Sequence, residues 1–192
     1  MKNILLIGGS YGIGLAIAKQ LQFENNVFIA SRSNENLADI EATYITFDAS
    51  TDVLDTSKLP SVIDGLVYCP GSINLRPFKG IKPETFEADL QINFISLVKV
   101  IQSVLPNLLA SEKASIVTFS SVAASMGMPF HTSVSASKGA IEGFAKALAA
   151  EYAPKIRVNV IAPSLTDTPL ADKFLNNETK QEKSAERHPL KR

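Results

Sequence analysis

The stretch ILLIGGSYGIG, residues 4–14, decides the fold of this chain. A short apolar run leads directly into glycines spaced G-x-x-x-G-x-G, and a helical pattern begins near Leu15. Gly8 suits a tight turn, Gly12 lets the backbone approach a pyrophosphate, and Gly14 allows the helix to pack closely on the strand. Amide groups at a helix start can face phosphates. The stretch therefore predicts a strand, turn and helix that bind a dinucleotide.

Five further apolar runs of strand length follow the first one along the chain. They alternate with helical patterns, and such alternation is typical of a doubly wound parallel sheet. We therefore expect an α/β fold: a Rossmann-type single domain with three layers, α/β/α. The six expected strands cover residues 4–7, 27–30, 44–47, 63–68, 115–119 and 157–161.

Two long helices and a charged tail complete the pattern. Apolar residues at three- and four-residue spacing continue from Leu90 to Leu108, and Pro106 should bend or end this helix. A second helix is expected over about 135–152. Residues 176–192 are strongly charged, which predicts an exposed helix or a frayed end.

Composition excludes several classes of protein. The chain has 192 residues, 45% hydrophobic content and formal net charge zero, so it has no general attraction to nucleic acid or anionic lipid. The apolar run at the N-terminus is too short for a secretory signal, and the uncharged stretch 114–130 is too polar for a membrane span. Cys69 is the single cysteine, which excludes an internal disulfide and fits a reducing cytoplasm. We expect a cytoplasmic protein with no metal site, nucleic acid or membrane partner.

A second stretch, TFSSVAASMGMPFHTSVSASKGA at residues 118–140, carries the candidate chemistry. This stretch resembles the active-site segment of the short-chain dehydrogenase/reductase superfamily. The glycine turn also has the spacing found in that superfamily. In that superfamily a serine lies thirteen residues before a tyrosine, and a lysine follows the tyrosine by four. Ser121 and Lys138 occupy two of these positions, and Val134 occupies the position of the tyrosine. The resemblance is therefore to a variant that lacks the active-site tyrosine.

The resemblance implies roles for the residues that remain. In the superfamily the serine polarises a carbonyl, the tyrosine supplies a proton, the lysine supports the tyrosine and holds the nicotinamide ribose, and an asparagine orders a water. Ser121, Lys138 and Asn93 match by position. Valine cannot transfer a proton, and loss of a positioned acid typically costs about 10²- to 10⁴-fold in rate.

Three replacements for the missing acid are open. His131 lies near the gap, and histidine is the side chain whose charge changes near neutral pH, although a lone histidine is more often a surface residue. Ser133 and Ser135 flank the gap but carry weakly acidic hydroxyls. Lys138 could act directly or through a water held with Asn93. The predicted catalytic residues are Ser121, Lys138, Asn93 and His131.

The end of the second strand predicts the choice of cofactor. It reads Ala30-Ser31-Arg32-Ser33, without the acidic residue that binds the ribose of NAD. An arginine here marks NADP preference in the superfamily, and a guanidinium with two hydroxyls suits a 2′-phosphate; the alternative is a surface arginine. We expect NADP(H) to be preferred over NAD(H).

The other cofactor contacts are carried over from the superfamily by position. Asp48 matches the aspartate beside the adenine, although it could equally cap a turn. Cys69-Pro70-Gly71 stands where asparagine-alanine-glycine is usual, and Ser164 replaces a usual glycine. The predicted cofactor-binding residues are Gly8, Ser10, Tyr11, Gly12, Ile13, Gly14, Ser31, Arg32, Ser33, Asp48, Gly71, Lys138, Pro163, Thr166 and Thr168.

The resemblance implies an NAD(P)-dependent oxidoreductase that reduces a small-molecule carbonyl with NADPH or oxidises the corresponding alcohol. It also implies a homodimer or homotetramer, formed through helices 86–109 and 135–152. The alternative is a non-catalytic NADP(H)-binding sensor or assembly subunit with a degenerate site. In relatives a segment like 186–192 leads into one more helix and strand, so we expect the single domain 1–192 to continue further.

Overall fold

The computed structural model describes residues 1–191, and its centre is a six-stranded parallel sheet with strand order β3-β2-β1-β4-β5-β6. The order reverses direction between β1 and β4, which makes their carboxyl ends the switch point where doubly wound sheets bind ligands. All six expected strands are confirmed. They are β1 (Lys2–Ile7), β2 (Asn25–Ser31), β3 (Ala42–Thr46), β4 (Gly65–Tyr68), β5 (Ala114–Phe119) and β6 (Ile156–Ile161).

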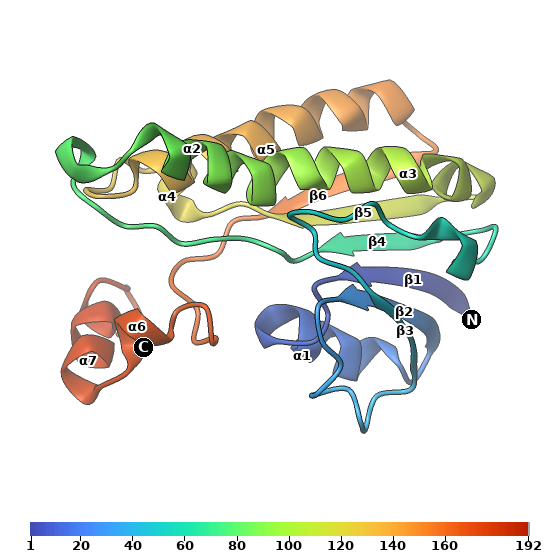
Figure 1. The fold of residues 1–192 in the computed structure, drawn as a ribbon, viewed down its shortest axis with the longest axis horizontal. Helices are drawn as coiled ribbons and strands as arrows, with labels where there is room; N and C mark the ends of the chain where they lie inside the picture. Colours follow the sequence, from blue (N-terminus) through green and yellow to red (C-terminus); the bar gives the residue numbers. More distant parts are fainter. Residues whose placement is uncertain (192) are drawn as a thin grey trace.

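Helices lie on both faces of the sheet, which confirms the three-layer α/β/α architecture (Figure 1). The helix α1 (Gly12–Leu21) packs on one face, and the helices α2 (Pro83–Leu90), α3 (Ser96–Ala110) and α5 (Thr132–Tyr152) pack on the other. The short elements are η1 (Thr56–Lys58), η2 (Phe78–Gly80), η3 (Gln91–Ile95), α4 (Val122–Ser125), α6 (Asp172–Leu175) and α7 (Glu178–Glu186). As expected, the charged tail contains an exposed helix, α7.

The larger hydrophobic core lies between the sheet and the pair α3 and α5. Residues Leu97, Ile101 and Leu108 of α3 are at most 2% exposed and pack against strand residues such as Leu66 and Ile116. A smaller core joins α1 to the opposite face. Burial of the apolar stripe of α3 follows from its three- and four-residue spacing.

Two helix boundaries differ from expectation. The amide of Leu15 donates to the Tyr11 carbonyl, so α1 begins at Gly12, three residues before the expected start. The helical segment from Pro83 continues past Pro106 to Ala110, and residues 91–95 of it are a π-helix. Pro106 therefore does not end the helix.

The helical segment Pro83–Ala110 is the one helix in the described part of the chain that is long and apolar enough to cross a membrane by length and composition. Core helices of globular proteins meet the same criterion. Here one side of the segment, including Val100 and Val104, is buried against the sheet, whereas Ile95 and Leu109 are each 38% exposed. Packing on the sheet therefore accounts for the buried apolar stripe of this helix.

The turn between β1 and α1 depends on its glycines. Gly8 and Gly12 have φ angles of 76° and 51°, the left-handed region that favours glycine. A Cβ atom at Gly14 would lie 2.2 Å from the carbonyl oxygen of Gly8. The first turn of α1 thus rests directly on the backbone of the turn, as the sequence predicted.

We expect Gly14→Ala to lower the free energy of unfolding by about 1–3 kcal/mol, the usual cost of overpacking, because the backbone must move to admit the methyl group. Gly143→Ala is the matched control, since a Cβ there meets nothing within 4 Å. This control should gain about 0.5–1 kcal/mol, because alanine favours a helix interior. Urea unfolding of the three proteins measures both changes, and equal stability of Gly14→Ala and the parent would contradict the packing argument.

Candidate functional site

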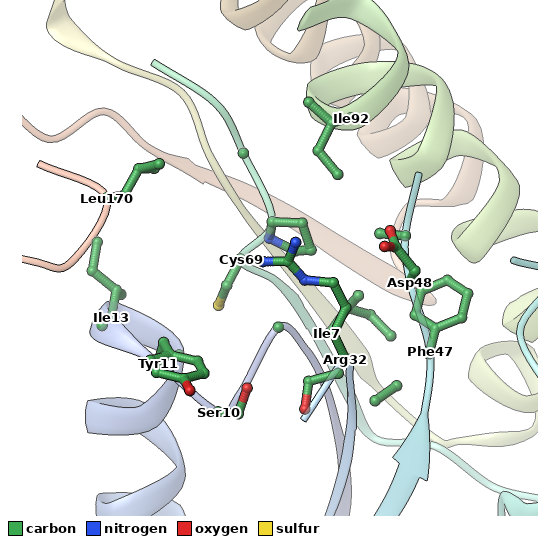
Figure 2. A pocket seen from close by; sticks show the side chains of 18 of the residues that line it. Ile7, Ser10, Tyr11, Ile13, Arg32, Phe47, Asp48, Cys69, Ile92 and Leu170 are labelled. Carbon is green, nitrogen blue, oxygen red and sulfur yellow. The ribbon is translucent and has the colours of Figure 1, made fainter. Parts of the chain in front are cut away.

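A cavity of about 760 Å³ opens at the carboxyl ends of β1, β2, β3 and β4 (Figure 2). Four segments form most of its wall: the glycine turn, the end of β2, residues 47–50 and residues 69–71. All predicted cofactor-binding residues line it except Lys138, Pro163 and Thr166. Ile7, Ala30, Phe47, Ile92 and Leu170 add apolar surface. Ligand sites are typically concave, with apolar walls and a few polar groups, and this cavity has both.

Arg32 extends into this cavity from the end of β2, as Figure 2 shows. Among residues 1–191, no carboxylate lies within ion-pair distance of its guanidinium. The Ser31 hydroxyl donates to the Ser33 carbonyl at 3.0 Å, which holds the turn around the arginine. The end of β2 therefore presents one free positive charge to the cavity.

Two acidic residues near the cavity have local partners. Glu35 accepts a hydrogen bond of 2.9 Å from the phenol of Tyr11 and is not part of the cavity wall. Asp48 lines the cavity, and its carboxylate also accepts from the Ser50 amide at 2.8 Å. Asp48 thus caps a turn, one of its two expected roles, while remaining available at the wall.

The segment after β6 approaches the glycine turn from the other side. Thr168 lines the cavity, and its Cβ lies 3.3 Å from the position that a Cβ of Gly12 would take. Pro163 lies apart from the cavity wall, and its carbonyl accepts from the Val122 amide beside Ser121. The Thr166 hydroxyl donates to the Ser164 carbonyl. Only Thr168 of the three predicted contacts in this segment therefore reaches the cavity.

Lys138 is 9% exposed and lies at the edge of the cavity, next to Gly71. Its ammonium donates to the carbonyl oxygen of Phe119 at 2.8 Å, so it sits at the end of β5, two residues before Ser121. Burial lowers the pKa of Lys138 to about 8, although the negative charge of Asp89 acts in the opposite direction. An ammonium with this pKa can release a proton near neutral pH.

Asn93 is fully buried in the π-helical segment η3 and has hydrogen-bond partners on both ends of its amide. The two hydrogens of its nitrogen are shared among three acceptors: the Ser137 hydroxyl at 3.1 Å, the Asp89 carbonyl at 2.9 Å and the Ser72 hydroxyl at 3.0 Å. Its oxygen accepts from the Ser72 amide at 3.2 Å. These bonds join η3 to α5 and to the loop after β4. Asn93 therefore holds the elements around Lys138 together, as a buried amide must have partners.

Ser121 directly precedes the short helix α4, and His131 follows it in the sequence at the start of α5. The Ser121 hydroxyl caps α4 by accepting from the Ala123 amide at 3.2 Å. His131 precedes α5, and its Nδ1 lies 2.6 Å from the Pro129 carbonyl oxygen. No hydrogen bond joins His131 to Lys138 or Ser121 in the described part of the chain. Val134, at the expected tyrosine position, is 5% exposed and packs as a core residue.

The serines that flank Val134 both have partners. Ser135 donates to the Ala123 carbonyl at 2.8 Å. Ser133 donates to the carboxylate of Asp89 at 2.6 Å, and Asp89 is 0% exposed. Sequence reasoning missed Asp89. Asp89 lies four residues before Asn93 and therefore on the same helix face. This spacing is the sequence feature that links Asp89 to the site.

Groups of histidine, cysteine and acidic residues that could hold a metal ion do not occur within residues 1–191. Cys69 lines the cavity, and burial raises the pKa of its thiol to about 12. The polar groups in and beside the cavity therefore include backbone amides, hydroxyls, the carboxylate of Asp48 and the cations of Arg32 and Lys138.

The sequence matches the family model described as short chain dehydrogenase over residues 2–179. It is 32% identical to the 3-oxoacyl-[acyl-carrier-protein] reductase FabG of Aggregatibacter actinomycetemcomitans over 190 residues, which covers 89% of this chain and 78% of that protein. These matches confirm the resemblance noted from the sequence.

Solved structures of other proteins are also similar to this chain. The Pseudomonas aeruginosa RhlG/NADP active-site complex superposes with a TM-score of 0.89 at 27% identity, covering 100% of this chain and 83% of that one. The ligand-free aldohexose dehydrogenase of Thermoplasma acidophilum gives a TM-score of 0.88 at 25% identity, covering 100% of this chain and 80% of that one.

Proposed function

The chain belongs to the short-chain dehydrogenase family and is an oxidoreductase of that type, and on this premise we propose that it uses NADP(H) to interconvert a small-molecule carbonyl and its alcohol. The observation that carries the proposal is the cavity at the switch point, with the glycine turn on one side and the free guanidinium of Arg32 on the other. Lys138 lies at the edge of this cavity.

The residues of the cavity fit a dinucleotide phosphate. Gly8 and Gly12 have positive φ angles and line the cavity. Because glycine has no side chain, a ligand can approach their backbone closely. The amides at the start of α1 suit a pyrophosphate. Arg32, flanked by Ser31 and Ser33, suits the 2′-phosphate, which NAD lacks. When bound, NADP(H) supplies or accepts the hydride.

We further propose that the site works without a tyrosine. The chain has four tyrosines, and three phenols have partners elsewhere: Tyr11 binds Glu35, Tyr44 donates to the Ser31 carbonyl and Tyr68 donates to the Ile92 carbonyl. The fourth, Tyr152, is the last residue of α5, fourteen residues after Lys138. The hydrogen-bond positions of these phenols support the proposal that none replaces the missing residue at Val134.

Lys138 is the proposed proton donor. In the reducing direction Ser121 donates a hydrogen bond to the substrate carbonyl and increases the positive charge on its carbon. When the carbonyl carbon gains the hydride that NADPH would supply, the C=O π pair moves onto oxygen, and the ammonium of Lys138 gives that oxygen a proton. The lysine becomes a neutral amine and regains a proton from solvent. Asn93 holds the lysine in place through Ser137 and the loop at Ser72. In the oxidising direction the neutral amine accepts the proton of the alcohol.

We also propose that the protein is cytoplasmic and self-associates through α3 and α5, as in the superfamily that it resembles. Apolar residues on the outer side of the helical segment support this proposal: Ile95 and Leu109 are each 38% exposed. Association would remove this apolar surface from water.

NADPH should bind roughly ten- to a hundredfold more tightly than NADH, the equivalent of one charge-assisted contact of about 1.5–3 kcal/mol. Arg32→Ala should remove most of this preference, whereas Arg157→Ala, which changes an exposed arginine on β6, should retain it. Isothermal titration calorimetry with both nucleotides measures the ratio. Equal affinities in the parent protein, or an unchanged ratio in Arg32→Ala, would contradict the role of Arg32.

The pH dependence should have opposite signs in the two directions. Carbonyl reduction needs the ammonium of Lys138, so its kcat should fall as the pH rises through about 8. Alcohol oxidation needs the neutral amine, so its kcat should rise through the same pH. Lys138→Met should abolish both, and Lys146→Met, an exposed lysine on the same helix, should abolish neither. Steady-state profiles from pH 6 to 10 test this assignment, and a reduction rate that rises above pH 8 would overturn it.

The variant His131→Ala distinguishes His131 from Lys138 as the proton donor. Because His131 binds only the Pro129 carbonyl, we expect the variant to keep turnover within about threefold of the parent, far less than the 10²- to 10⁴-fold loss of a positioned acid. The measurement is kcat for NADPH oxidation with one responsive carbonyl. A loss of a hundredfold or more, with NADPH affinity unchanged, would instead assign the proton to His131.

A further inference from the structure

The carboxylate of Asp89 is completely buried between α2, α5 and the loop after β4. It accepts three hydrogen bonds: from the Ser72 hydroxyl, from the Asn74 amide at 2.7 Å and from the Ser133 hydroxyl at 2.6 Å. The nitrogen of Asn74 can only donate, so the oxygen facing it is an acceptor. Donors therefore face both oxygens of this buried carboxylate.

A buried negative charge is costly unless a positive charge compensates it. The only ion pair within 4.0 Å among residues 1–191 joins Lys58 and Asp55 on the surface, so Asp89 has no direct cationic partner. Lys138 is also buried, at 9% exposed, and the negative charge of Asp89 acts to raise the pKa of this lysine. Each charge would be uncompensated without the other.

Asp89 and Lys138 approach each other at the loop after β4. The Ser72 hydroxyl binds both Asp89 and the amide nitrogen of Asn93. Asn93 Oδ1 and Lys138 Nζ lie 2.9 and 3.3 Å from the place that a Cβ of Gly71 would take. The side chain that is hydrogen-bonded to Asp89 through Ser72 therefore lies beside Gly71, as the ammonium does.

We infer that Asp89 is a positioning residue whose carboxylate is the buried counter-charge that keeps Lys138 protonated in the site. This inference rests on the proposed role of Lys138 as the proton donor. Asp89 does not touch the cavity, so it acts on the lysine and not on the substrate.

Other titratable groups near Lys138 do not supply this charge. Cys69 faces the lysine from the end of β4, but its thiol is neutral at pH 8, since its pKa is raised to about 12. Glu142 lies one turn further along α5 and accepts the Ser120 hydroxyl at 2.6 Å. Asp89 is thus the acid whose negative charge lowers the free-energy cost of burying the Lys138 ammonium.

The test follows the titration of Lys138 directly, by the ¹³Cε resonance of labelled lysine, assigned through its loss in Lys138→Met. We expect a midpoint near 8 in the parent protein and a fall of about one pH unit or more in Asp89→Asn, because an adjacent opposite charge moves a midpoint by this amount. Glu87→Gln changes an exposed carboxylate on the same helix and should leave the midpoint unchanged. The pH profile of carbonyl reduction should move with the midpoint.

Two outcomes would overturn the inference. One is a folded Asp89→Asn protein whose Lys138 midpoint equals that of the parent. The other needs no variant: a parent midpoint of about 5–6, the value of a buried lysine without a counter-charge, would show that Asp89 does not act on it. If the titration behaves as expected but no carbonyl is reduced, the proposed function fails while the role of Asp89 stands.

Discussion

The hydrogen bond from the Lys138 ammonium to the Phe119 carbonyl is the interaction on which the arrangement of the site depends. It fixes α5 to the end of β5 and brings a positive charge to the edge of the cavity, beside Gly71. A lysine in this position needs both a polar partner and a counter-charge, because burial disfavours its charged form. The Phe119 carbonyl is the polar partner, and Asp89, held by Ser72 and Ser133, is the proposed counter-charge.

Two halves of the molecule form different parts of the site. Strands β1, β2 and β3 with α1 form the part that suits the nucleotide, since the glycine turn and Arg32 come from there. Strands β4 and β5 with α2, η3 and α5 carry the polar chain around Lys138. The two parts meet at Gly71, between the glycine turn and the lysine. A nucleotide in the cavity would therefore extend toward the proposed proton donor.

Much of this could be predicted from the sequence, because the relevant signals are local. Apolar runs and their alternation with helices specified six strands, and the spacing of Gly8, Gly12 and Gly14 specified the turn. The roles of Asp89, Ser133 and Ser72 could not be predicted, since their hydrogen bonds join residues 17 and 44 positions apart. An aspartate on a helix usually lies in solvent, and only the packing of α2 against α5 shows that this one is buried.

Val134 stands where the resemblance places a tyrosine, and we propose that carbonyl reduction proceeds here with Lys138 as the acid. The most direct measurement is deuterium transfer. The protein is incubated with NADPH that carries deuterium at the reactive nicotinamide carbon and with a broad panel of ketones and aldehydes, and the alcohols are analysed by mass spectrometry. The account predicts a deuterated alcohol with the parent protein and none with Lys138→Met. Tight NADPH binding with no deuterium in any alcohol would contradict it and would favour a nucleotide-binding protein without turnover.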